Sequence, residues 1–402
     1  MNEYVQVMTS TLLSESEDLL DEAVRLRREL HQHPELGLHN DRTRERLLDA
    51  IDGLDLEVTA NTNCSGIMAV LNGDDHGPTM LLRADMDALP LREDADLPFK
   101  STTENMMHAC GHDLHVSMLV GATKMLHARR KEIRGRVVLM FQPGEEGYHG
   151  ARYMIEDGLL SVAGPISKAF AIHVSTVAPS GVVALKPGPF MASSDMFKIR
   201  VHGRGGHASA PHHALDPIPI ACEIVLALQT MITRRIDVFD PGVVTVAKIQ
   251  SGTTTNVIPP TADILGTIRA VSERTRTNIH SSLQRVADGI ASAHDATAEV
   301  EIELGYPVTV NNDSVAADVI RVGTDLFGTE RMHTMKAPVM GSEDWSYVLQ
   351  NVPGAMAFLG ATPHGSDPFK AAPNHSNLVY FDEATMSTGI ALYTAMTLDY
   401  LK

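Results

Sequence analysis

The spacing of apolar and polar positions predicts the first helices of the chain. Apolar residues between positions 14 and 31 recur at helical intervals, and we therefore predict an amphipathic helix there. Its apolar face holds Leu19, Leu20, Ala23, Val24, Leu26 and Leu30. A second helix is predicted at 41–52.

Short apolar runs bounded by polar turns come next, at 66–71, 79–84, 136–141 and 168–174. They alternate with helical stretches such as 114–129. This order is typical of buried strands in an α/β sheet.

The pattern changes after Pro187-Gly188-Pro189, where turn residues interrupt the chain. Strands and helices then follow in the order β-α-β-β-α-β, which is the order of a ferredoxin-like domain. The predicted strands are 196–203, 243–250, 262–270 and 298–304, and the predicted helices are 216–235 and 272–294.

An α/β pattern then resumes, with a helix at 313–327, an apolar run at 354–361 and a helix near 383–400. We therefore predict an α/β catalytic domain formed by residues 1–186 and 304–402. The smaller domain, residues 187–303, is inserted into it.

Composition narrows the partners and the compartment. The 402 residues have a formal net charge of -17 and no block of Lys or Arg, which argues against nucleic acid and anionic membrane surfaces as partners. The first residues lack the pattern of a secretory signal, and no uninterrupted apolar run approaches the ~20 residues that span a bilayer. Cys64, Cys110 and Cys222 are too few and scattered for a disulfide framework, so we expect a cytoplasmic protein.

Reactive side chains gather where the predicted strands end. Ligands of open α/β sheets bind beyond the carboxyl ends of strands. The stretch "HACGHDLH" (108–115) opens a helix in the same region, and "APNHSNLVY" adds a late candidate, His375. The side chains at the strand ends are Asp85, Asp87, Glu145, Glu146 and His173.

Each of these residues alone has a structural explanation. A buried His is usually hydrogen-bonded in the core, a single Cys is usually a small apolar residue, and Glu145-Glu146 could be a solvated turn. The stretch "HGRGGH" (202–207) lacks the strand–loop–helix context of a phosphate-binding loop. The coincidence of Cys-x-His, Glu-Glu and a strand-terminal His at one edge of one sheet instead indicates a metal site.

The number of ligands favours two ions. One thiolate, one carboxylate and three imidazoles are more than one zinc normally takes, and a bridging thiolate can serve two ions about 3.5–4 Å apart. Adjacent side chains in extended backbone point to opposite sides, so one of Glu145 and Glu146 can bind metal while the other reaches the attacking water. A carboxylate in that place is a general base for hydrolysis.

These residues belong to a set of motifs that resembles peptidase family M20, the aminoacylase and carboxypeptidase metallopeptidases, in its amidohydrolase subgroup. The subgroup includes hippurate hydrolases, N-acyl-amino-acid amidohydrolases, N-acetyldiaminopimelate deacetylases and auxin-conjugate hydrolases. The motifs cover nearly the whole chain in the right order: "RRELHQHPELG" (27–37), "RADMDALP" (83–90), "HACGHDLH" (108–115), "QPGEEGYHGARYMIEDG" (142–158), "GRGGHASAPH" (203–212), "TTTNVIP" (253–259), "GTIRA" (266–270), "GSEDW" (341–345) and "NHS" (374–376).

The resemblance implies a zinc-exopeptidase-like catalytic domain, in which helices flank a mixed sheet, and two divalent metal ions per subunit (Zn, Mn, Co or Ni). Cys110 would bridge the ions, His112 and His173 would complete one site, and Glu146 and His375 the other. Glu145 would be the general base. Asp87 matches an acid that orients a ligand from behind, a role that fixes a His tautomer.

The resemblance further implies that the inserted domain is a lid that also forms a homodimer. His207 would reach the partner subunit's active site and stabilise the oxyanion. Asn256 and Arg269 match substrate-binding positions, and a guanidinium suits bidentate capture of a free carboxylate.

The chain departs from the family pattern in three places. Asp85-x-Asp87 stands where the broader peptidases have His-x-Asp, so Asp85 is not assigned as a ligand and His112 supplies the missing imidazole. Leu38-His39-Asn40 replaces a frequent acid, a change that we attribute to packing. Trp345 stands where many members have Phe and could alter the acyl pocket.

The leading hypothesis is therefore metal-dependent hydrolysis of a small N-acyl-L-amino acid. A carboxypeptidase or dipeptidase that uses the same site is the near alternative. Two others remain open: an amidase with Cys110 as nucleophile, paired with His108 or His112, and a non-catalytic binding protein.

Overall fold

The computed structural model describes residues 3–402, with side chains from residue 10 onward, and divides into two compact units. Unit 1 comprises residues up to Gly188, Val310–Ala337 and Tyr347–Lys402, and unit 2 comprises Pro189–Thr309 and Pro338–Ser346. The sequence-based boundaries, 187 and 303, are close to these limits. The return segment 338–346 was not suggested by the hydrophobic pattern, because it is short and irregular.

Unit 1 is built on an eight-stranded mixed sheet in the order β1-β2-β4-β3-β5-β16-β6-β15. Strands β3, β4, β5 and β16 run parallel to their neighbours within the group β4-β3-β5-β16. The strands are β1 (Glu57–Ala60), β2 (Ile67–Asn72), β3 (Asp75–Asp85), β4 (Arg134–Gln142), β5 (Ile166–Ser175), β6 (Val183–Leu185), β15 (Met332–Thr334) and β16 (Gly354–Gly360). The four strands predicted from apolar runs at 66–71, 79–84, 136–141 and 168–174 are β2 to β5.

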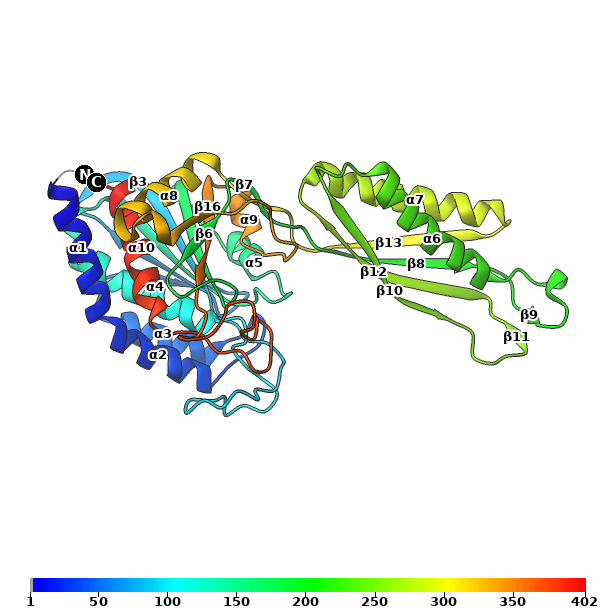
Figure 1. The fold of residues 1–402 in the computed structure, drawn as a ribbon, viewed down its shortest axis with the longest axis horizontal. Helices are drawn as coiled ribbons and strands as arrows, with labels where there is room; N and C mark the ends of the chain where they lie inside the picture. The colour runs from blue at the N-terminus through cyan, green and yellow to red at the C-terminus, as the bar shows by residue number, and fades with distance from the viewer. Residues whose placement is uncertain (1–2) are drawn as a thin grey trace. The chain divides into compact units, whose positions relative to one another are not determined.

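Helices flank this sheet, as Figure 1 shows. Helices α4 and α10 pack against each other and against β3, with α1 and α2 outside them, while α5 packs against β4. The helices are α1 (Glu3–Asp18), α2 (Leu20–Gln32), α3 (Asp41–Ile51), α4 (His112–Ala128), α5 (Gly150–Glu156), α8 (Asp313–Phe327), α9 (Ser346–Leu349) and α10 (Thr385–Tyr400). Since central strands and helix α4 are covered on both sides, they are buried along most of their length.

The helix predicted from residue 14 to 31 is wrong in its extent. The structure has two helices there, α1 and α2, separated at Leu19. Leu19 has right-handed helical backbone angles, so α1 and α2 are joined by a bend in the helix axis and not by a loop. The hydroxyl of buried Ser16 donates to the Leu13 carbonyl at 2.8 Å, a side-chain bond that commonly bends helices.

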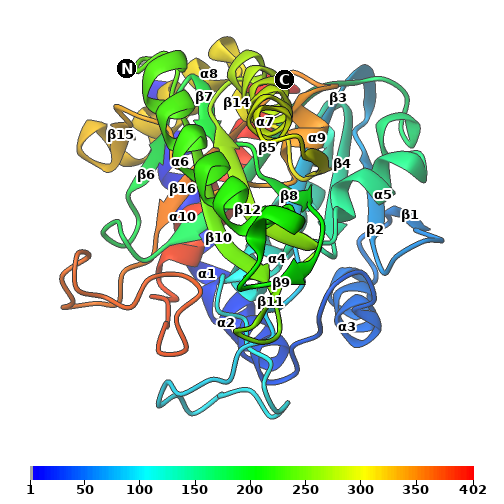
Figure 2. The ribbon, with the colours of Figure 1, turned by 90° about the vertical axis from the view of Figure 1, so that its right-hand side faces the viewer.

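Unit 2 has the predicted β-α-β-β-α-β order around a four-stranded antiparallel sheet, β10-β12-β8-β13. Helices α6 and α7 lie side by side on one face of it (Figure 2). The elements of unit 2 are β8 (Asp195–His202), β9 (Gly206–His207), α6 (Pro217–Arg235), β10 (Gly242–Ser251), β11 (Val257–Ile258), β12 (Thr261–Ala270), α7 (Glu273–Ala293) and β13 (Thr297–Leu304). The short strands β7 (Gly188–Met191) and β14 (Thr309–Asn311) span its two sequence limits.

Local sequence explains why these helices form. Asp216 caps α6 by accepting from the Ile218 amide, with Pro217 at the first helical position, and Ser272 caps α7 in the same way. Strand β12 alternates buried and half-buried residues, which is the pattern of a sheet with one covered face. Within the described residues, α6 is the one helix long and apolar enough to span a bilayer, but Ile220, Ile224 and Leu228 are buried in the core of its own unit.

Candidate metal centre

The carboxyl ends of three parallel strands meet at one edge of the unit 1 sheet. Asp85 at the end of β3 pairs in register with Gln142 at the end of β4, and β5 beside them carries His173. Helix α4 begins at the same edge. Its cap, Gly111, has a φ of 89°, and a Cβ there would lie 2.4 Å from a methyl group of Val174. Only glycine allows the start of α4 to approach β5 this closely, and the approach places the neighbouring Cys110 beside β5.

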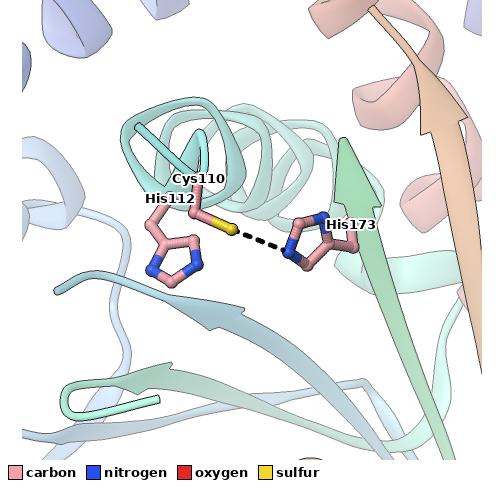
Figure 3. Close-up of side chains that lie close together, drawn as sticks. All are labelled: Cys110, His112 and His173. Carbon is pink, nitrogen blue, oxygen red and sulfur yellow. Dashed lines mark hydrogen bonds between the residues drawn. The ribbon is translucent and has the colours of Figure 1, made fainter. Parts of the chain in front are cut away.

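Five donor side chains converge at this edge, and Cys110 is common to two groups of them. Its Sγ lies 3.4 Å from Nε2 of His173 (Figure 3) and 3.1 Å from Nε2 of His375. His375 Nε2 is in turn 3.2 Å from Oε1 of Glu146. In each group the ligand atoms lie within 4.8 Å of one another, and the groups are Cys110, His112, His173 and Cys110, Glu146, His375.

The donor chemistry fits a pair of divalent cations. The ring of His173 donates from Nδ1 to the Val174 carbonyl at 2.7 Å, so the neutral ring presents the lone pair of Nε2 to the thiol. Thiolate, imidazole and carboxylate together form a donor set that zinc and neighbouring transition metals bind. One shared sulfur with two donors on either side is an arrangement that two ions can occupy.

Electrostatics at the site point the same way. Burial opposes ionisation of Cys110, but the nearby imidazoles, His173 foremost, lower the pKa of its thiol to about 5. Hydrogen bonds to Cys110 and Glu146 raise the pKa of His375 to about 10. A ring that holds a proton so tightly lies in a strongly negative field, and the same field attracts a metal cation.

Asp87 and Glu145 lie behind and beside these donors. The buried carboxylate of Asp87 accepts the backbone N–H groups of Glu145 and Glu146, each at 3.0 Å, and lies 3.4 Å from Nδ1 of His112. Glu145 is 6 % exposed, and its carboxylate lies within 4.8 Å of His112 and Glu146 donor atoms. The Asp87 carboxylate therefore fixes the backbone of both glutamates and faces a candidate ligand.

Three residues outside the predicted ligand set, His115, Asp85 and Asn374, also brace the centre. His115 accepts the Val174 amide at Nε2 (2.8 Å), so its proton is on Nδ1, which donates to Asp85 at 2.5 Å. Asp85 is also paired with buried Arg83 at 2.7 Å, so it serves this network. The Asn374 amide donates to the carbonyls of Cys110 and Val174, at 3.1 and 3.0 Å. Its position next to His375 in the sequence is the signal that could have identified it.

A buried ionic network lies on the other side of the start of α4, and sequence reasoning missed it. Asp113 forms an ion pair with Arg27, whose Nε lies 2.8 Å from its carboxylate, and it lies 2.8 Å from Nδ1 of His31. Nε2 of His31 faces Glu93 at 3.1 Å. The available signal was in helix α2, where Arg27 and His31 stand four residues apart on the face that packs inward.

In unit 2 the predicted substrate residues fall into two places. His207 and Asn256 lie together, because β9 pairs with β11 and the Ala208 amide donates to the Asn256 carbonyl at 3.1 Å. Arg269 lies at the opposite end of β12, where it donates to Ser342 at 2.9 Å. Eight residues of strand separate Thr261 from Arg269, which is roughly 26 Å.

The ring of His207 has a defined tautomer. Its Nδ1 accepts the backbone N–H of Ser209 at 3.1 Å and lies 2.7 Å from the Ser209 hydroxyl. The neutral ring therefore carries its proton on Nε2 and presents a donor. Trp345, by contrast, is fully buried, and its amide donates to the Glu343 carboxylate at 3.0 Å.

Comparisons with known proteins agree with this geometry. Residues 81–399 match the profile of the family described as Peptidase family M20/M25/M40. The chain is 36% identical to thermostable carboxypeptidase 2 of Saccharolobus solfataricus over 98% of this chain and 99% of the relative. It is 37% identical to the IAA-amino acid hydrolase ILR1-like 2 of Arabidopsis thaliana, over 99% and 89%. Among solved structures, the Bacillus subtilis YxeP protein, described as a dinuclear metal binding peptidase from the M20 family, superposes with a TM-score of 0.84 at 29% identity, over 96% of this chain and 99% of that one.

Proposed function

Because this chain belongs to peptidase family M20, a family of metal-dependent hydrolases that includes amidohydrolases and peptidases, we propose that it hydrolyses the amide bond of N-acyl-L-amino acids. The resemblance read from the motifs is thus confirmed at the level of family. The observation that carries the proposal is that one thiol, Cys110, is shared by two ligand groups with the buried carboxylate of Glu145 beside them.

The proposed ligand sets follow the two groups. Cys110 would serve both of two divalent ions, with His112 and His173 as the further ligands of one and Glu146 and His375 as those of the other, in accord with the two groups of donor atoms. Zn, Mn, Co or Ni suits these donors. When bound, such ions supply Lewis-acid activation of the attacking water and of the scissile carbonyl.

Glu145 performs the proton transfers in this proposal. Its carboxylate takes a proton from the attacking water and delivers it to the leaving nitrogen as the C–N bond breaks. The products are a carboxylate and a free amino acid. Asp87 supports the step, because it holds the Glu145 amide and faces His112.

Substrate recognition is assigned to three residues of unit 2. The guanidinium of Arg269 binds the free carboxylate of the amino acid, and Asn256 contacts the same substrate. His207 donates from Nε2 to the oxyanion, a role supported by the tautomer that Ser209 imposes.

We propose a homodimer, and the spacing of these residues supports it. Arg269 lies near the end of β12 whereas His207 and Asn256 lie beyond its start, and the strand from Thr261 to Arg269 by itself spans roughly 26 Å, so we infer that one copy of unit 2 does not bring all three to one small substrate. Two copies related by a dyad can each supply one end. Strand β10 is an edge strand with Val243 and Ile249 42% and 49% exposed, which suits pairing with a second copy.

We keep the cytoplasm as the proposed compartment. All three cysteines are free, and the proposed role of Cys110 requires a reduced thiolate.

The decisive variant is Glu145→Gln. We expect kcat to fall by about 10²–10⁴-fold, since a general base is lost, with two metal ions per subunit still bound by elemental analysis. Near-normal turnover in this variant would overturn the assignment of the base.

A carboxypeptidase or dipeptidase is the second candidate, and the 36% identity to the Saccharolobus carboxypeptidase over 98% of this chain supports it. A product assay over a grid of acyl groups and amino acids, run beside dipeptides and with Mn, Zn, Co and Ni, separates the two. Faster turnover of dipeptides than of every N-acyl amino acid would exchange the leading and second candidates.

A further inference from the structure

The loop that carries Glu145 and Glu146 contains an unusual backbone conformation. Three of its residues have positive φ: Gly144 at 69°, Gly147 at 87° and His149 at 59°. Glycine adopts this region freely, whereas a residue with a Cβ is disfavoured there by roughly 1–2 kcal/mol. His149 therefore stands where glycine would form the same turn without strain, and strained residues of this kind cluster at functional sites.

The side chain of His149 makes a contact that glycine could not make. Its Nδ1 lies 2.8 Å from the hydroxyl of Tyr347, within hydrogen-bond distance. Tyr347 is on the short helix α9, where its carbonyl accepts the side-chain amide of Asn351 at 2.8 Å and its neighbour Val348 is fully buried. The hydrogen bond thus connects the end of the loop to an anchored helix.

The loop is closed and short, so its two ends are mechanically coupled. The Gly150 amide donates to the Gly144 carbonyl at 3.0 Å, and the Gly147 amide donates to the Glu145 carbonyl at 2.7 Å. A Cβ on Gly150 would lie 1.6 Å from the Pro143 carbonyl oxygen, so the crossing of the two ends leaves no space. A rotation at His149 therefore moves the backbone of Glu145 as well.

The first half of the loop has its own supports. Asp87 accepts the amides of Glu145 and Glu146, and a Cβ on Gly144 would lie 2.7 Å from a methyl group of Leu38. This contact gives Leu38, one of the departures from the family pattern, a packing role. Asp87 and Leu38 hold one half of the loop, and Tyr347 holds the other through His149.

We propose that His149 and Tyr347 form a positioning pair that sets the orientation of the Glu145 carboxylate. The proposal deepens the proposed function and rests on it, since Glu145 is the base of that reaction. His149 itself is a positioning residue: it acts through the closed loop, and its strained conformation is held by the hydrogen bond to Tyr347.

The test uses Tyr347→Phe, His149→Gly and the double variant in the metal-loaded full chain. Each single variant should lower kcat about tenfold with KM within about twofold, because a general base displaced by a fraction of an ångström loses much of its effect. The double variant should lose no more than His149→Gly, since both changes remove one interaction. Wild-type kcat in either single variant, or losses that multiply in the double variant, would overturn the pair.

Two further substitutions separate the hydrogen bond from the strain. His149→Ala and His149→Gly both remove the imidazole, but only the alanine variant keeps the strained φ, so His149→Gly should melt at the higher temperature with an equally low kcat. His149→Asn keeps a polar group that tolerates this backbone region and should recover part of kcat. Equal loss of activity and stability across the series would reduce His149 to a structural residue.

Asp295→Gly is the matched control. Asp295 has a φ of 56° in the turn between α7 and β13, far along the chain from the loop. The Asp295→Gly variant should change the melting temperature only through the relief of backbone strain, and its kcat should equal that of the wild type. If kcat also falls in Asp295→Gly, the fall in His149→Gly cannot be attributed to the loop, and the positioning pair is contradicted.

Amide hydrogen exchange over residues 144–150 gives a readout that needs no substrate. Tyr347→Phe should raise exchange at Gly147 and Gly150, whose amides close the loop. Unchanged exchange overturns the positioning pair even if the enzyme hydrolyses N-acyl amino acids. Raised exchange together with an active Glu145→Gln variant would instead show that Glu145 is not the general base. Failure of the positioning pair and failure of the proposed function can therefore be told apart.

Discussion

The residues on the two sides of the start of α4 differ both in exposure and in how their charges are balanced, since His375 on one side is 53% exposed whereas Arg27 and His31 on the other are fully buried. On the side of the candidate metal centre, the thiol of Cys110 and the rings of His173 and His375 turn their donor atoms toward one another. On the other side, Arg27 and His31 face the carboxylates of Asp113 and Glu93. The second side is neutral by itself, whereas the first has the donors of a cation site.

This contrast separates function from support within one short stretch of sequence. A network whose charges cancel needs no ligand, and it stabilises the fold only while every member is present. A cluster of thiol, imidazole and carboxylate donors can hold a cation, and it contributes to stability chiefly when the ion is bound. Removing one residue from each side should therefore give opposite phenotypes.

The largest effect is expected on activity, from Cys110→Ser. Loss of the shared thiolate should lower turnover by about 10³-fold or more and reduce the bound metal below two ions per subunit, because sulfur is the ligand common to both groups. Elemental analysis and a hydrolysis assay measure both. The unfolding midpoint in the presence of chelator should match that of the wild type, and a large drop there would assign Cys110 to the core instead.

Arg27→Met tests the supporting side. It leaves the carboxylate of Asp113, which is fully buried, with His31 alone, and breaking a buried pair in this way costs about 3–5 kcal/mol of unfolding free energy. Urea unfolding of the metal-free protein measures it. Metal stoichiometry should stay at two ions per subunit in the folded variant, and a loss of metal without a loss of stability would contradict the division into two sides.

Metal removal by a chelator should destabilise only the first side. An ion present at about 1,000 times its dissociation constant stabilises a folded protein by about 4 kcal/mol, so the wild type should melt at a lower temperature after chelation. Cys110→Ser should show a smaller shift. Activity lost with the chelator and restored by added metal also argues against Cys110 as a nucleophile, whereas activity that survives chelation would support it.

The same contrast explains which parts of the site were predictable from sequence. Strand ends, a Cys-x-His pair and adjacent glutamates are local signals, and the parallel strands β3, β4 and β5 bring them to one edge. Family motifs then gave each residue a role. The supporting side joins residues far apart in sequence, such as Arg27 and Glu383 at 3.1 Å, and no local pattern encodes such a pair.

The fold shows the same limit. Apolar runs gave β2 to β5 and the order of unit 2, because burial on both faces or one face leaves a clear period. The bend at Leu19 and the return of residues 338–346 to unit 2 involve local hydrogen bonds, such as that from the Ser16 hydroxyl to the Leu13 carbonyl at 2.8 Å and that from the Val339 amide to the Phe190 carbonyl at 3.0 Å. Such bonds leave no period in the sequence.

His31 makes the supporting side sensitive to pH. Burial by itself would lower the pKa of this imidazole, but Asp113 and Glu93 outweigh burial and raise it. The folded protein therefore holds this proton more tightly than the unfolded chain, so the stabilisation is complete below the ordinary His pKa and is lost as pH rises through the folded value. His31→Gln should flatten the fall of unfolding free energy on the alkaline side, where one proton contributes at most about 1.4 kcal/mol per pH unit. An unchanged slope in urea titrations between neutral and alkaline pH would mean that His31 is not the titrating group.

The smallest effect is expected from Arg28→Met, the neighbour of Arg27 that shares its partner Glu383. Arg28 donates from Nε to Glu383 at 2.9 Å, but its side chain is 46% exposed while that of Arg27 is 1% exposed. Water and salt screen an exposed pair, so the loss should be about 0.2–1 kcal/mol and should shrink further at high ionic strength. The matched comparison is the unfolding free energy of Arg27→Met and Arg28→Met in low and high salt. If both variants lose the same amount, exposure does not separate the two arginines, and the supporting side is not the closed ionic network that its contacts indicate.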